Sequence, residues 1–125
     1  MLPAFLIPEN IAREDGQGSE IALEAAAGRP LLLTLGITRI LEQQSLDVSI
    51  LGSPDGVAWE VLASFPQKFY CGSYAMLLDL SHRPGVRKLR ANWKMGRWGR
   101  GDQKPQFGFY LVAQEAKVQV AASVA

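Results

Sequence analysis

The segment from Leu46 to Leu62 reads as two strands joined by a tight turn, and it constrains the fold more than any other part of the sequence. Apolar Leu46, Val48 and Ile50 alternate with polar residues, as in a strand that buries one face. The Ser-Pro-Asp-Gly sequence at 53–56 then predicts a turn, because proline presets φ at one corner and glycine accepts a positive φ at another. This β-hairpin predicts a chain built from antiparallel strands.

The other segments repeat this pattern of short apolar or alternating runs that end at turn residues. Further strands are predicted at residues 31–40, 74–80, 86–95 and 107–113. Residues 20–25 are expected to form a short strand, with a short helix over 21–27 as the alternative, because Gly28 and Pro30 end the segment so soon. Gly36 predicts a bulge or bend inside the most apolar run. We therefore expect an all-β, jelly-roll-like antiparallel β-sandwich that forms a single domain over residues 1–125.

The two ends of the chain are expected to differ from the strands between them. Residues 1–11 carry Pro3 and Pro8 and predict an N-terminal arm or an edge strand. Residues 115–125 are small and mildly apolar, and they predict a tail that frays. The apolar N-terminus lacks a basic region and is too short to span a bilayer, so neither a signal peptide nor membrane insertion is expected.

Cysteine and histidine usage limits the chemistry that this chain can perform. Cys71 is the only cysteine and His82 the only histidine, which excludes an internal disulfide, a multi-cysteine zinc site and a histidine-based metal site. The sequence supplies no base beside Cys71, so we expect a buried or half-buried, inert thiol. His82 lies in a predicted turn, so we expect its imidazole to be solvated. These features predict a soluble, cytoplasmic protein that has no cofactor and is not an enzyme.

Charge is distributed unevenly along the chain, although the net charge is only +1. Residues 1–60 hold nine acids and three bases, a net charge of −6, whereas residues 61–125 hold ten bases and three acids, a net charge of +7. This asymmetry favours an anionic partner or head-to-tail self-association if the two halves form separate surfaces. If the halves interleave in a sandwich, the charges mix in space instead.

A basic segment from Arg87 to Lys104, in which Trp93 and Trp98 are interleaved, is the best candidate for a ligand site. Arginine beside an exposed tryptophan suits sugars, whose apolar ring face stacks on indole while guanidinium groups bond the hydroxyls. The same pair suits nucleic acid, but the whole chain is not basic enough for us to expect that partner. The residues predicted to bind a carbohydrate or other small anionic ligand are Trp98, Arg97, Arg100, Lys94 and Tyr70.

The same segment also has a purely structural interpretation. By its alternation, Trp93 points into the core, and Lys88, Arg90 and Lys94 then form a solvated strand face. Only the loop at 97–100 would remain without a structural explanation. The sequence leaves both interpretations open.

Two stretches resemble a known family. Val48-Ser49-Ile50, the turn at 53–56 and Trp59 are similar to the strand, turn and tryptophan of the discoidin-like, galactose-binding-like jelly roll, the fold of coagulation-factor C-type domains. The strand at 86–91 is similar to a later strand of that family. The resemblance implies binding of sugars, phospholipid head groups or proteins through loops at one end, without catalysis. This chain departs from the family in lacking the cysteine pair that often joins its ends and a clear version of its N-terminal strands.

Two functions of different classes follow from these observations. The first is a non-catalytic binding module of the galactose-binding-like type, which would use the basic aromatic loop. The alternative is a structural or assembly protein that forms a homo-oligomer or part of a larger protein particle. In that case the N-terminal arm and the basic loop would make the subunit contacts.

Overall fold

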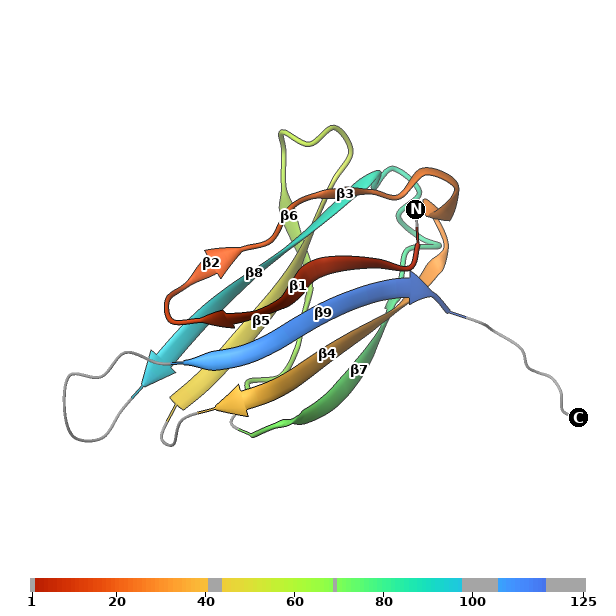
Figure 1. The fold of residues 1–125 in the computed structure, drawn as a ribbon. Coiled ribbons are helices and arrows are strands. Elements are labelled where there is room, and N and C mark those ends of the chain that lie inside the picture. The colour runs from red at the N-terminus through yellow and green to blue at the C-terminus, as the bar shows by residue number, and fades with distance from the viewer. Residues whose placement is uncertain (1, 41–43, 69, 98–105, 117–125) are drawn as a thin grey trace, which may run out of the picture.

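A computed structural model describes residues 2–40, 44–68, 70–97 and 106–116 of the chain, and almost all of its regular structure is β (Figure 1). A single turn of 3₁₀ helix lies at Glu24–Ala26. The strands are β1 (Ala4–Ala12), β2 (Gly16–Gln17), β3 (Ile21–Ala22), β4 (Pro30–Ile40), β5 (Gln44–Ser53), β6 (Glu60–Ser64), β7 (Gly72–Asp79), β8 (Lys88–Arg97) and β9 (Phe107–Glu115).

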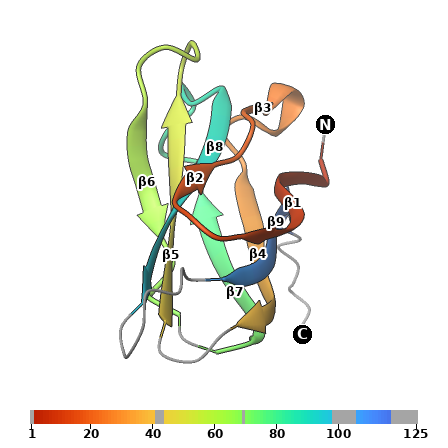
Figure 2. The same cartoon turned by 60° about the vertical axis from the view of Figure 1, so that its left-hand side comes forward.

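These strands form two antiparallel sheets packed face to face. The four-stranded sheet has the order β1-β9-β4-β7, and the five-stranded sheet has the order β2-β8-β5-β6, with β3 also paired to β8. Figure 2 shows the two layers, with β5 and β6 on one side and β4 and β9 on the other. The all-β sandwich predicted from the sequence is therefore confirmed.

The topology is that of a jelly roll, in which the whole chain behaves as one long hairpin wrapped into a sandwich. Nested pairs join β5 to β6, β4 to β7, β2 and β3 to β8, and β1 to β9. Pairing of β5 with β8 and of β4 with β9 then completes the sheets. The turn between β5 and β6, at residues 54–59, is the innermost tip of this arrangement.

Alternating apolar residues from both sheets fill the space between the layers. In β5, Leu46, Val48 and Ile50 are buried, as their spacing predicts. The largest fully buried side chains include Phe107 and Phe109 of β9. Other buried residues of the same core are Leu6, Ile7, Leu31, Leu33, Leu35, Ile37, Leu89, Ala91, Leu111 and Ala113.

The N-terminal residues form an edge strand of their own sandwich. β1 pairs with β9, and the side chains of Leu6 and Ile7 are 0% and 1% exposed. At the other end of the chain, Glu115 pairs with Leu31, and the amide of Ala116 donates to the carbonyl of Pro30 at 3.1 Å. Residues 115 and 116 thus bond to β4, and the remainder of the predicted tail, 117–125, lies outside the described residues.

Three local predictions differ from the structure. Gly36 lies in regular pairing with β7 and β9, and the register shift comes later, between Ile37 and Arg39. A Cβ on Gly36 would overlap the ring of Tyr110, so glycine is needed there for close approach rather than for a bulge. The segment 20–25 divides into β3 and the 3₁₀ turn. Cys71 is exposed rather than half-buried, because it lies in the connection that leads into β7.

Among the described residues, no helix has the length and apolar character needed to cross a membrane.

Candidate functional site

A row of uncharged polar side chains crosses the outer face of the five-stranded sheet. Gln17 of β2 lies opposite Asn92 of β8, and Asn92 lies opposite Ser49 of β5. Ser49 pairs in turn with Ser64 of β6, and their hydroxyls are 3.0 Å apart. Because residues in register on neighbouring strands share a face, these four side chains form one continuous line, which we call the polar row.

The polar row forms part of a groove with a volume of about 540 Å³. Asp15, Gln17, Asp47, Ser49, Asn92, Trp93 and Lys94 line it together with Gly16 and Val61. This volume is within the usual range for small-molecule sites. Ser49 and Asn92 are half-buried, and the amide of Asn92 makes no hydrogen bond to the part of the chain that the structure describes. Two amide donors and one carbonyl acceptor are therefore available in the groove.

Charged groups lie at one end of this groove. Asp47 and Lys94 face each other across β5 and β8, and Gln67 donates from Nε2 to Asp47 Oδ2 at 3.1 Å. The carboxylate of Asp15 accepts a hydrogen bond from the backbone N–H of Met95 at 2.7 Å. Both signs of charge are thus present, and the groove as a whole does not favour a strongly anionic ligand.

Trp93 closes the side of the groove where β2 meets β8. Its indole Nε1–H donates to the carbonyl of Glu14 at 2.9 Å, and its ring packs edge-on against Phe109 with centroids 5.3 Å apart. A Cβ on Gly16 would lie 2.6 Å from Cζ2 of Trp93, so only glycine allows β2 to approach the ring this closely. The structural interpretation of Trp93 as a core residue is correct in part, because the ring is only partly buried and also lines the groove.

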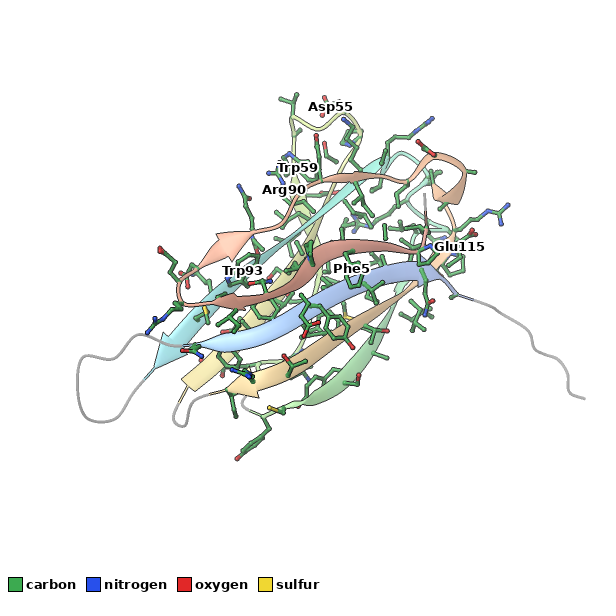
Figure 3. All side chains as sticks on the ribbon, viewed as in Figure 1. Phe5, Asp55, Trp59, Arg90, Trp93 and Glu115 are labelled. Atoms are coloured by element: carbon green, nitrogen blue, oxygen red, sulfur yellow. The ribbon has the colours of Figure 1, made fainter. Side chains whose placement is uncertain are left out.

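Arg90 lies over the ring of Trp59 on the same sheet face, with the guanidinium carbon 4.5 Å from the ring centroid. Figure 3 shows the pair below the hairpin tip that carries Asp55. Arg90 also donates from Nη1 to Gln17 Oε1 at 3.5 Å, which joins this stack to the polar row. Its buried Nε has no partner among the described residues.

A second hollow of about 440 Å³ lies at the base of the hairpin, between residues 52–60 and the turn at 83–86. Its walls are mostly apolar and include Pro54, Trp59 and Val86. An ion pair between Arg83 and Glu60, 3.0 Å apart, lies at this hollow. Trp59 therefore contacts Arg90 and also lines the apolar hollow.

The structure places only part of the predicted loop site. Lys94 is exposed in the groove. Tyr70 is 72% exposed in the connection between β6 and β7. The backbone of Arg97 ends β8, opposite Gln44, whereas Trp98 and Arg100 lie outside the described residues. The loop site as a whole thus stays a prediction.

The groove residues beside Lys94 were missed at the level of sequence. The alternation that puts Lys88, Arg90 and Lys94 on one strand face also puts Asn92 there. That face becomes a site only when Gln17 and Ser49 are paired to it, and neither pairing leaves a signal in the sequence.

Charges from the two halves of the chain meet in space. Ion pairs join Arg83 to Glu60 at 3.0 Å and Lys88 to Glu20 at 3.7 Å. A third pair joins Arg29 to Glu115 at 3.4 Å. Each pair connects a residue from 1–60 with one from 61–125, so the wrapped hairpin interleaves the acidic and basic halves.

The two residues considered for catalysis lie apart from the groove. Cys71 precedes β7 and His82 lies in the turn after it, and both are exposed. Beside His82, the pKa of Asp79 is lowered by hydrogen bonds from the backbone N–H and hydroxyl of Ser81 and, to a smaller extent, by the histidine. Within the described ranges, no group of three or more potential metal ligands occurs.

The fold and the groove define a jelly-roll β-sandwich with a polar cleft on the outer face of one sheet. The chain matches no protein-family model and no curated protein sequence. The resemblance to discoidin-like domains accordingly stays a prediction.

Proposed function

We propose that this protein is a non-catalytic binding module that holds a carbohydrate or a similar small polar ligand in the groove of the five-stranded sheet. The observation that carries the proposal is the polar row, in which the Asn92 amide lies between Gln17 and Ser49 and has no hydrogen-bond partner among the residues that the structure describes. The two amides and two hydroxyls of this row offer donors and acceptors side by side, which is what neighbouring sugar hydroxyls require.

Two further features favour a neutral or weakly charged sugar. Asp47 and Lys94 supply charge of both signs at the end of the groove, so charge-assisted bonds to hydroxyls are available. Trp93 also lines the groove and adds an aromatic residue to its polar side chains. Such a function is also of the kind that the resemblance to galactose-binding-like domains implies.

Binding to a panel of neutral and acidic oligosaccharides, followed by calorimetry on the best-bound sugar, tests this proposal. We expect Asn92→Ala to weaken binding by about 2- to 12-fold, because one hydrogen bond contributes about 0.5–1.5 kcal/mol. Gln114→Ala is the matched control, since it removes an exposed side-chain amide from the outer face of the other sheet.

A third variant separates the groove from the predicted basic loop. If Trp98→Ala abolishes sugar binding while Asn92→Ala leaves it intact, the site is the loop and the groove proposal is wrong. Absence of binding across the whole panel would contradict both.

A further inference from the structure

The outer face of the four-stranded sheet has a chemistry opposite to that of the groove. In register, Leu32 lies beside Leu77, Thr34 beside Ala75, and Val112 beside Phe5. Phe5 and Leu77 are 53% and 60% exposed. None of the side chains in the central rows is charged; these residues are Phe5, Leu32, Thr34, Ser73, Ala75, Leu77, Tyr110, Val112 and Gln114. An exposed, uncharged surface of this kind is typical of a contact with another protein surface.

The edges of the two sheets differ in how they resist pairing with another strand. Natural edges are protected by shortness, prolines, charges or bulges. β1 contains Pro8 and two register shifts, and β6 has five residues, a register shift and Glu60. On the remaining side of the five-stranded sheet, β2 and β3 have only two residues each.

β7 is the edge that lacks these protections. Its eight residues pair with β4 without a register shift, and they include no proline, lysine or arginine. The only charged residue is Asp79 at its end. Within the described part of the chain β7 pairs with β4 alone, and Figure 1 shows it as the outermost strand of its sheet. Half of its backbone N–H and C=O groups therefore point away from the sheet.

We propose that two copies of this chain join β7 to β7 around a two-fold axis and form one continuous eight-stranded sheet. A two-fold axis perpendicular to the sheet makes the two β7 strands antiparallel, so their outward N–H and C=O groups can pair with each other. With Met76 on the axis, Ala75 lies opposite Leu77 and Ser73 opposite Asp79. No like charges then face each other, and the uncharged face continues across the axis.

The chemistry of β7 favours a second copy over a charged partner. A strand that recognises an acidic or basic peptide would present the complementary charge along its edge, and β7 presents none between Gly72 and Leu78. The proposed contact also differs from head-to-tail association of acidic and basic surfaces, because raising the salt concentration does not weaken an uncharged interface. The contact lies on the opposite sheet from the groove and is independent of it.

Light scattering of the full chain at low and high salt tests this interface. We expect wild-type protein to have twice the monomer mass at both salt concentrations. Leu77→Lys places two lysines on the same face of the new sheet, diagonally across the two-fold axis, and it should return the protein to monomer mass at the same concentration. Val61→Lys is the matched control, because Val61 is 59% exposed on β6, the edge strand of the other sheet; this variant should stay dimeric.

Each other outcome overturns the proposal. Wild-type protein that is monomeric at high concentration has no such contact, and a dimer that survives Leu77→Lys uses another surface. A dimer that dissociates on raising salt is held by charge. Because Leu77→Lys could disturb folding, hydrogen exchange on wild-type protein is a second measurement: amides of β7 should become more protected as concentration rises, and unchanged protection would contradict the pairing.

Discussion

Arg90 is the residue whose environment depends most on contacts between distant parts of the chain. Its guanidinium lies over Trp59 from the hairpin and reaches Gln17 from β2. Such a planar cation on an indole ring contributes about 0.5–2 kcal/mol, depending on how much water is excluded. Arg90 thereby connects the turn that leads into β6 with the polar row.

A double-mutant cycle on Arg90 and Trp59 measures this contact. We expect a coupling free energy of about 1 kcal/mol between Arg90→Ala and Trp59→Leu in urea unfolding. Arg87→Ala, which removes an exposed arginine just before β8, should leave unfolding nearly unchanged. A coupling energy near zero would mean that the ring and the guanidinium only lie near each other.

Single residues also show which contacts could not be predicted from the sequence. The indole Nε1–H of Trp59 donates to the carbonyl of Gly56 at 3.1 Å, a contact within the same turn. The contact with Arg90 could not be predicted, because it depends on the register of β8 against β5. Of the groove residues, only Lys94 was predicted to bind ligand, since pairing across strands leaves no local pattern.

At the scale of elements, the hairpin of β5 and β6 is the most locally determined part of the fold. Ser53 Oγ accepts hydrogen bonds from the amides of Asp55 and Gly56 at 3.2 and 2.7 Å, and Gly56 has φ of +84°. Asp55 Oδ1 accepts from the amides of Val57 and Ala58 at 2.8 and 3.1 Å. All these partners lie within a few residues of each other, which is why the turn could be predicted. β2 and β3 are too short to produce a pattern, and they form because β8 is available beside them.

The same turn predicts a pH dependence of stability. The amides of Val57 and Ala58 and the hydroxyl of Ser53 lower the pKa of Asp55 below its usual 3.8. Because the folded state favours the ionised form, this contribution is complete above the unfolded-state pKa, near pH 4, and is lost as pH falls through the lower folded-state pKa. The urea midpoints of wild type and Asp55→Asn should therefore differ at pH 7 and converge below pH 4.

Asp79→Asn provides the comparison for this experiment. The pKa of Asp79 is also lowered, chiefly by the backbone N–H of Ser81, but Asp79 lies at the end of β7, away from the hairpin. That variant should keep the part of the pH dependence that arises from Asp55. If Asp55→Asn follows the wild-type curve at every pH, the hydrogen bonds to Asp55 do not favour its ionised form.

At the scale of the whole molecule, the nested hairpin brings the two ends of the described chain together in one sheet. β1 and β9 are the first and last strands, and they pair directly. Short apolar runs and turns in the sequence predict this sandwich class. The strand order does not follow from them, because several wrappings bury the same residues. The strand order in turn brings the acidic and basic halves of the chain together in space.

Because β1 is an edge strand of its own sandwich, the effect of substitutions in it on stability can be predicted. Leu6 is fully buried against the core of its own sandwich, so Leu6→Ala should lower the free energy of unfolding by about 2–5 kcal/mol. Phe5→Ala, in the adjacent and half-exposed position, should cost less. Neither substitution should change the mass in solution, because β1 and β7 are opposite edges of the four-stranded sheet. If Leu6→Ala instead changes the mass and leaves stability intact, β1 packs on a neighbouring copy and the sandwich closes only in the oligomer.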